Sequence, residues 1–245
     1  MIPIIFLLFG CTPKQSKVNE FLQSSSATAL EKDYYEVTKL LLSLKQKLDA
    51  RNPNQYDKQR VFYIEKEIKE GTNKLFLAYE GKYLKDYDAY LKVAFTKKPD
   101  IQKRNDYLIL GLNKLINETY KKQEGHKFTT LGFEKENFKK LYYYLKVLNW
   151  KLKTDRDEKG DYLFLTWQKN WQIELEKSLK TQTLKNLEEL PHIKSKKETL
   201  LEPSNFSFEV IMNQMFFHVK NSSVHVGDEP LELSLEAMKS LVFFL

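Results

Sequence analysis

The chain has 245 residues, of which 42% are hydrophobic and 30% are charged, a composition of folded rather than disordered proteins. Only 8 glycines and 7 prolines are present, fewer than sheet-rich folds usually need for turns, so long helices are favoured. The formal net charge is +7, but lysines alternate with acidic residues, as in 65–70. That alternation is typical of a solvated helix face, and with no Arg-rich block or nucleic-acid-binding motif we expect no nucleic-acid partner.

An apolar run occupies residues 2–9, interrupted only by Pro3. It is far shorter than the roughly 20 residues of a membrane-spanning helix, and its length suits the hydrophobic region of a signal peptide. The run ends in Leu8-Phe9-Gly10-Cys11. This ending resembles the lipobox of bacterial lipoproteins, in which the cysteine receives a diacylglycerol and becomes the first residue after cleavage.

The resemblance implies a signal peptide over 1–10 and lipidation at Cys11, the only cysteine of the chain. The polar residues that follow, within 11–27, suit a tether leaving a membrane. A fold with no second cysteine does not rely on disulfides, which is compatible with the periplasm. Thr12 is not the aspartate associated with inner-membrane retention, so the resemblance favours the outer membrane slightly. The alternative is an apolar strand packed into the fold with a buried cysteine.

Apolar residues at helical spacing predict six helices after the tether. Their stripes cover 37–48, 61–79, 87–95, 108–119, 138–152 and 164–179, the last extending toward Leu190. Arg51-Asn52-Pro53 is expected to end the first helix and Pro99 the third, whereas the second is expected to continue past Gly71. Gly125 is a plausible cap for the fourth helix.

The predicted fold is all-α, an irregular antiparallel bundle or array of about six to eight helices with a possible small C-terminal appendage. We expect a main domain over 28–190, a linker over 191–204, and a C-terminal helical segment, 205–245, docked on it. Residues 205–220 fit either a strand or a helix, and the helix is preferred because the neighbouring segments are helical. A turn is expected over 224–230, before a last short helix.

The sequence 155–161 has the acidic spacing of a calcium loop, but it lacks the ligands that calcium needs. Lys159 stands where an oxygen ligand is required, and Thr166 stands where a bidentate glutamate should close the site. We therefore interpret Asp155, Asp157, Gly160 and Asp161 as a turn between helices. In that turn Gly160 adopts the left-handed conformation and Asp161 caps the next helix.

The four histidines are scattered, and no pair has metal-ligand spacing on one helix. His218 and His225 are expected to be separated by a break at Asn221-Ser222-Ser223. Carboxylate pairs could in principle perform acid–base chemistry, but each lies near a predicted helix start, where acids favour the macrodipole. These pairs are Asp86 with Asp88 and Glu134 with Glu136. We therefore expect no metal, no cofactor and no catalytic residue.

Aromatic residues are abundant, with 14 Tyr, 16 Phe and 3 Trp. Tyr142-Tyr143-Tyr144 cannot all face one core, because consecutive helical residues point about 100° apart. Trp167 and Trp171 are predicted to share a helix face, either in the core or as an aromatic patch. The candidate partner-binding residues are Tyr143, Trp167, Trp171, Phe243 and Phe244.

These features together favour a lipid-anchored interaction or structural protein of the bacterial cell envelope over an enzyme. Its expected partners are the membrane, through acylated Cys11, and an envelope protein. One alternative is an envelope enzyme acting on peptidoglycan or another glycan. Another is a basic protein that binds anionic envelope polymers or lipid headgroups.

Overall fold

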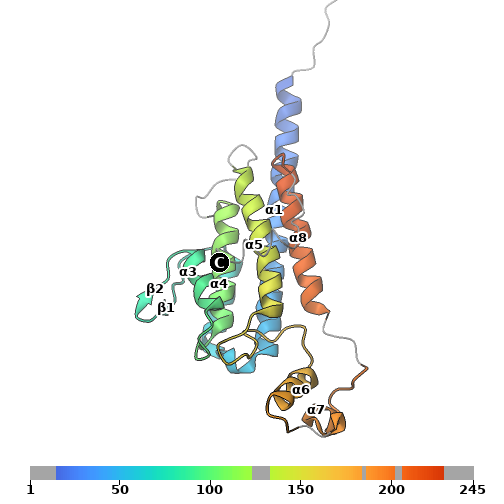
Figure 1. The fold of residues 1–245 in the computed structure, drawn as a ribbon. Coiled ribbons are helices and arrows are strands. Elements are labelled where there is room, and N and C mark those ends of the chain that lie inside the picture. The colour runs from blue at the N-terminus through green and yellow to red at the C-terminus, as the bar shows by residue number, and fades with distance from the viewer. Residues whose placement is uncertain (1–14, 123–132, 184–185, 202–205, 229–245) are drawn as a thin grey trace, which may run out of the picture.

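The computed structural model describes residues 15–122, 133–183, 186–201 and 206–228, with side chains from Ser25 onward. These residues form eight α-helices and one two-stranded hairpin (Figure 1). The all-α prediction is therefore confirmed, and the number of helices agrees with the expected range.

Helix α1, Gln15–Arg51, is the longest element, with 37 residues. At about 1.5 Å per residue it is roughly 55 Å long, and its first turns project beyond the other helices (Figure 1). It begins inside the polar segment expected to be a tether. It ends as predicted, because Pro53 starts a short 3-10 helix, η1 (Pro53–Gln55).

Four long helices make the body of the molecule. They are α1, α4 (Arg104–Thr119), α5 (Lys135–Thr154) and α8 (Ser207–His225). Helix α1 packs on α4 and α8, and α5 closes the ring by packing on the same two helices. Each neighbour runs in the opposite direction, which is the antiparallel arrangement that was predicted (Figure 1).

The core of this ring is a continuous apolar cluster contributed by all four helices. Its members repeat every three or four residues along each helix, so the stripes predicted for α1, α4 and α5 are the faces that become buried. Representative core residues are Leu41, Leu44, Leu48, Leu108, Leu112, Leu115, Leu141, Leu145, Leu148, Met212, Met215 and Val219.

Helix α2 (Lys58–Glu70) ends at Gly71, so the prediction that it continues toward Tyr79 is wrong. Gly71 adopts a left-handed φ of 62° and donates its N–H to the carbonyls of Glu67 and Ile68. A side chain there would meet the Tyr34 hydroxyl at 2.4 Å, so glycine is also required sterically. The chain then forms the hairpin of β1 (Ala78–Tyr79) and β2 (Lys82–Tyr83).

Helix α3 (Tyr87–Phe95) begins and ends as expected and packs on α4. The Asp86 carboxylate caps it by accepting the Ala89 N–H at 2.8 Å. At its other end, the buried Arg104 guanidinium donates to the carbonyls of Ala94 and Thr96, at 2.7 and 2.8 Å. The orphan carbonyls of this short helix are thus satisfied by a side chain of α4.

The stripe predicted over 164–179 is only partly helical, because α6 covers Asn170–Lys180. Phe164 and Trp167 precede the helix in an irregular segment. This segment is held by Asn52, whose side chain accepts the Leu165 N–H at 2.8 Å and donates to the Leu165 carbonyl at 3.0 Å. A tertiary contact therefore overrides the helical spacing.

A small unit at the foot of the molecule contains α6, the 3-10 helix η4 (Leu187–Glu189) and α7 (Pro191–Lys194) (Figure 1). The segment expected to be a linker thus contains a helix and contacts α6. Glu198 accepts the Asn170 side-chain amide at 2.7 Å and the Trp171 N–H at 3.1 Å. Arg51 ties this unit to the end of α1 by donating to Asn170 at 2.6 Å.

Candidate interaction surface

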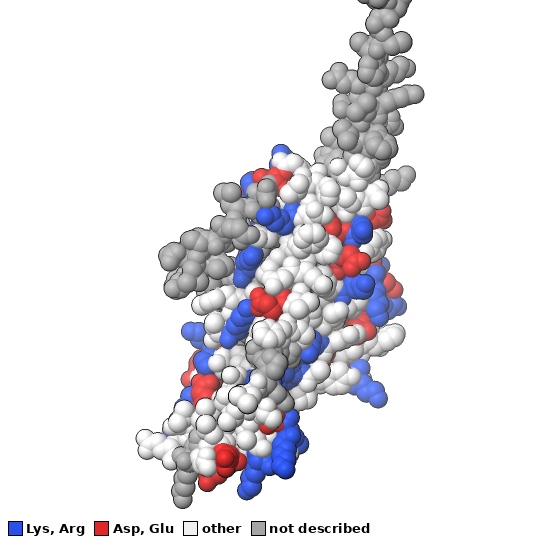
Figure 2. Space-filling model, turned by 90° about the vertical axis from the view of Figure 1, so that its right-hand side faces the viewer, with Lys and Arg blue, Asp and Glu red and all other residues white. Residues whose placement is uncertain are grey.

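Helix α8 exposes a stripe of apolar side chains on its outer face. Phe206, Val210, Phe217 and Val224 are 59%, 53%, 64% and 49% exposed. At about 100° per residue, these positions fall within roughly 40° of one another around the helix. Figure 2 shows the face that includes α8, and an uncharged band runs along it between charged side chains. We call these four residues the α8 stripe.

The opposite face of α8 is buried against α1 and α5. Phe208, Met212, Met215 and Val219 are each 0% exposed, which makes α8 apolar on two opposite faces. The preference for a helix over 205–220 is confirmed. The predicted break at 221–223 is wrong, because the helix continues to His225 and only then ends.

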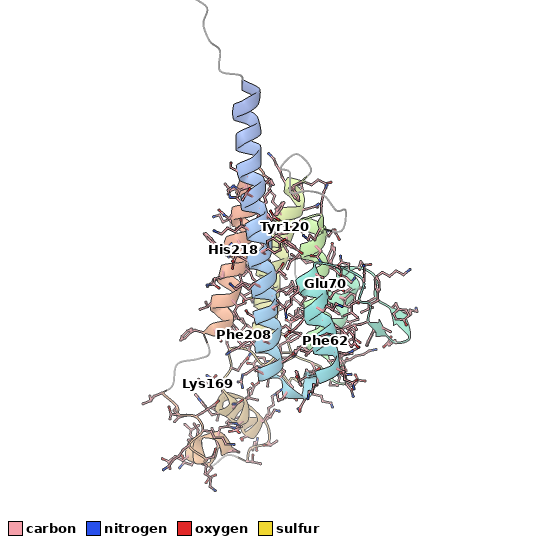
Figure 3. The ribbon with its side chains drawn as sticks, turned by 180° about the vertical axis from the view of Figure 1, so that it is seen from behind. Phe62, Glu70, Tyr120, Lys169, Phe208 and His218 are labelled. Atoms are coloured by element: carbon pink, nitrogen blue, oxygen red, sulfur yellow. The ribbon has the colours of Figure 1, made fainter. Side chains whose placement is uncertain are left out.

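A buried polar network fixes α8 on α1. The Asp33 carboxylate, 4% exposed, accepts hydrogen bonds from Asn221 Nδ2 at 3.1 Å and Ser222 Oγ at 3.2 Å. His218 Nδ1 lies 2.8 Å from the same carboxylate, and the Tyr120 hydroxyl lies 2.7 Å from Ser222 Oγ. Tyr120 and His218 lie toward the same end of the bundle (Figure 3). The stripe is therefore presented by a helix held in one rotational setting.

A shallow hollow of about 460 Å³ continues the stripe beyond Phe206. Trp167 and Tyr162 line it, and the half-buried Trp167 ring packs on Phe208 at 5.4 Å between centroids. Lys153 Nζ lies 4.4 Å from the centre of the Trp167 ring and 2.5 Å from Glu209, so the cation at this edge is neutralised. The hollow is accordingly an apolar floor with a paired charge at its rim.

The structure separates the predicted partner-binding residues. Trp167 lies beside the α8 stripe, whereas Trp171 is half-buried on α6. Tyr143 is half-buried on α5, and its ring centre lies 6.1 Å from that of Tyr142. Trp167 and Trp171 do not share a helix face, because only Trp171 is in a helix. Phe243 and Phe244 lie outside the described residues, as does Cys11. The residues that sequence reasoning missed are those of the α8 stripe.

The residues considered for chemistry have structural partners. His192 pairs with Glu174 and His218 with Asp33. Glu134 and Glu136 lie at the start of α5, as Asp86 and Asp88 do for α3, so their placement at helix starts is confirmed. His126 and Gly125 lie outside the described residues. Within the described part of the chain, the His, Cys, Asp and Glu side chains form no group that could hold a metal ion.

The loop considered for calcium is closed by its own hydrogen bonds. Gly160 has the predicted left-handed φ of 78°. Asp157 accepts the N–H groups of Lys159 and Asp161, both at 2.9 Å. Asp161 is not the cap of a helix, because α6 starts only at Asn170. A single bridge, Arg156 with Tyr162, makes this segment a small antiparallel loop.

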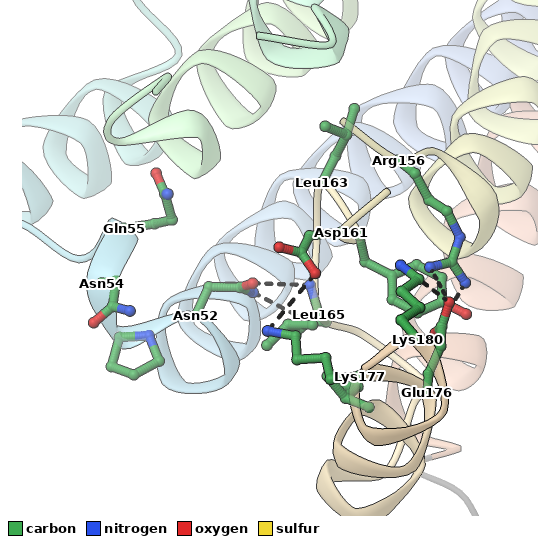
Figure 4. A pocket seen from close by; sticks show the side chains of 13 residues that line it. Asn52, Asn54, Gln55, Arg156, Asp161, Leu163, Leu165, Glu176, Lys177 and Lys180 are labelled. Atoms are coloured by element: carbon green, nitrogen blue, oxygen red, sulfur yellow. Dashed lines mark hydrogen bonds and ion pairs between the residues drawn. The ribbon is translucent and has the colours of Figure 1, made fainter. Parts of the chain in front are cut away.

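A pocket of about 220 Å³ lies between this loop, α6 and the end of α1 (Figure 4). Its charged side chains form ion pairs with one another. Arg156 binds Glu176 at 2.6 Å, Lys180 lies 3.8 Å from Glu176, and Lys177 lies 3.7 Å from Asp161. These ion pairs hold α6 against the loop and leave little charge free for a ligand.

In comparisons with protein-family models, with curated proteins and with solved structures, the chain matches none.

Proposed function

We propose that this protein is a lipid-anchored interaction protein of the bacterial cell envelope, and that its α8 stripe holds an amphipathic helix of a partner protein. The carrying observation is the apolar stripe on the outer face of α8. Its side chains are about half to two-thirds exposed although they are large and apolar. Large apolar side chains that line up on one exposed face of a helix are typical of a helix–helix interaction site.

The spacing of the stripe supports a helical partner. Val210, Phe217 and Val224 are seven residues apart, and Phe206 lies four before Val210. Helices that pack side by side present apolar residues at a heptad spacing of this kind. The positions between them, Asn213 and Lys220, are polar. The partner helix is therefore expected to offer one narrow apolar seam with polar groups facing these two residues.

The anchor is supported by the sequence Leu8-Phe9-Gly10-Cys11 and by the helix that follows it closely. Helix α1 begins at Gln15, and Leu30 is the first residue of the buried core among the side chains that the structure describes, from Ser25 onward. The preceding helical turns would separate the bundle from the membrane. None of the described helices is long and apolar enough to cross a membrane.

The anchor is tested by Cys11→Ser expressed in bacteria fed a labelled fatty acid. We expect the wild type to take up the label and to fractionate with membranes, and the variant to lose both properties. A wild-type chain that carries no label, or a variant that stays on membranes, would disprove lipidation at this cysteine.

The surface is tested by placing a photo-crosslinking amino acid at Phe217 in the anchored protein. We expect one recurrent cross-linked envelope protein, lost when Val210→Ser and Val224→Ser are introduced. Phe62 on α2 is the matched control, because it is 66% exposed where Phe217 is 64% exposed. Equal cross-linking from position 62 would contradict the proposal. So would a cross-link only to a second copy of this chain.

A further inference from the structure

A second pocket, of about 290 Å³, lies between the loop after α2, the start of α3 and the outer face of α4. Asn73 and Phe76 line it from the loop, Tyr87 from α3, and Lys114 and Glu118 from α4. It is separate from the α8 stripe, which lies on another helix of the ring.

The lysine in this pocket is buried without a counter-ion. Lys114 is only 5% exposed. Its Nζ donates to the Asn73 carbonyl at 3.4 Å and lies 4.4 Å from the Phe76 ring centre and 5.6 Å from that of Tyr90. Among the described residues, no carboxylate lies within ion-pairing distance of this ammonium group.

The wall around Lys114 is built from buried amide groups. Asn117, 1% exposed, donates to the Thr72 carbonyl and to Asn73 Oδ1, both at 3.2 Å. Its own Oδ1 accepts the Tyr34 hydroxyl at 2.9 Å. Asn113 donates to the same Thr72 carbonyl at 3.3 Å. The loop that covers Lys114 is therefore held mainly by these amide groups, beside the single long bond from the ammonium group to the Asn73 carbonyl.

The rim carries charges of both signs. Lys85 and Lys121 also line the pocket, against the carboxylates of Asp86 and Glu118. Asp86 is already occupied in capping α3, and Lys121 lies 3.7 Å from Glu134. Burial lowers the pKa of Lys114, an effect that the more distant Glu67 and Asp86 carboxylates only partly oppose. A buried cation of this kind is stabilised by a direct anionic partner.

We propose that this pocket binds a small molecule bearing a carboxylate or a phosphate group, with Lys114 as the direct counter-ion. The rings of Phe76 and Tyr87 would contact the apolar body of that molecule. The pocket of Figure 4 differs in this respect, because each of its cations lies within ion-pairing distance of a carboxylate of the same chain.

The test is calorimetric titration of the full chain in detergent with benzoate, phenyl phosphate and benzyl alcohol. These probes share an aromatic body and differ in charge. We expect an anion to bind at least about tenfold more tightly than benzyl alcohol, the difference expected of a charge-assisted hydrogen bond. Comparison of the two anions identifies whether the site prefers a carboxylate or a phosphate.

Lys114→Met removes the charge at similar length and is expected to weaken the anion by about tenfold or more. Lys74→Met, an exposed lysine of the same loop, is the control and should change affinity less than about twofold. No anion binding to the wild type, or equal binding to Lys114→Met, would overturn the proposal.

A measurement on the wild type covers the case in which Lys114→Met does not fold. In the ¹⁵N-lysine-labelled chain, the anion that binds should raise the pKa of Lys114, because an anion favours the charged form. An unchanged Lys114 pKa at saturating benzoate and phenyl phosphate would overturn the assignment of Lys114 as the counter-ion.

Discussion

Among the buried lysines of the described residues, Lys45 and Lys114 are in opposite electrostatic situations. Lys45 on α1 is 0% exposed and pairs with Asp49 on the same helix and with Asp106 on α4 at 3.0 Å. Arg60 reaches the other oxygen of Asp106 at 3.5 Å. Among the described residues, the ammonium group of Lys114, which is 5% exposed, contacts the Asn73 carbonyl and the rings of Phe76 and Tyr90.

Lys45 therefore belongs to a paired network that stabilises the fold, whereas Lys114 has no ion-pair partner among the described residues. The charges around Lys45 compensate each other between α1 and α4, so this network needs nothing from outside the chain. Although burial raises the pKa of Asp106, Lys45 and Arg60 oppose that shift. The cost of burying Lys114 is not offset in this way, and uncompensated buried charge is more often associated with function than with folding.

The largest effect is expected from Lys45→Met, which would leave the buried Asp49 without its cation and Asp106 with only the more distant Arg60. The free energy of unfolding should fall by about 3–5 kcal/mol, the usual cost of breaking a buried ion pair from one side. Urea unfolding measures it. Lys66→Met, at an exposed ion pair on α2, serves as the control and should change stability by less than about 1 kcal/mol. If Lys45→Met were as stable as Lys66→Met, the network around Lys45 would not stabilise the fold.

The second-largest effect is expected at Asp33, in the buried polar network that fixes α8 on α1. Asp33→Ala would leave the donors of Asn221 and Ser222 without their acceptor and should cost about 2 kcal/mol. Hydrogen exchange should accelerate in α8 more than in α4, because the network joins α8 to α1. Glu31→Ala, an exposed acid two residues earlier, should have little effect. Unchanged exchange in α8 would show that apolar packing alone holds this helix.

The smallest effect is expected from Lys114→Met in the absence of ligand, a gain of up to about 1 kcal/mol, since a desolvated cation is replaced by an apolar chain. The folded-state pKa of Lys114 is lowered from 10.5, so the unfolded chain binds the proton more tightly. The cost of the charge is therefore present below the folded-state pKa and disappears as the pH rises to 10.5. The advantage of the variant should shrink over that interval. An advantage independent of pH would contradict the assignment.

Local sequence signals predicted the end of α1 and the bounds of α3, and failed where distant residues intervene. Pro53 and Asp86 mark the end of α1 and the start of α3 through their own backbone chemistry. The apolar spacing continues across Gly71, yet the helix ends there, because Gly71 adopts a left-handed φ, and the Tyr34 hydroxyl leaves no space for a side chain at this position. Trp167 lies outside a helix because Asn52, far away in the sequence, binds the adjacent backbone.

The surface of α8 could not be identified from its sequence because both of its faces are apolar. Phe208 and Phe217 have similar chemistry, but only the packing against α1 and α5 decides that the first is 0% and the second 64% exposed. The heptad spacing of Val210, Phe217 and Val224 was a visible signal, obscured by the buried stripe beside it. Lys114 gave no sequence signal, since lysines are common in every helix of this chain.

Because α1 is one continuous helix, it also determines how the bundle is placed relative to the first turn of α1. Between Gln15 and Leu30 the helix is about 22 Å long, and a flexible chain of the same length would have a similar average reach but a broad distribution. A rigid helix fixes both the distance and the rotational angle between its two ends. Two residues inserted into it would turn the bundle by about 200° at almost constant height. The α8 stripe is therefore held at one distance and one rotational angle relative to the first turn of α1.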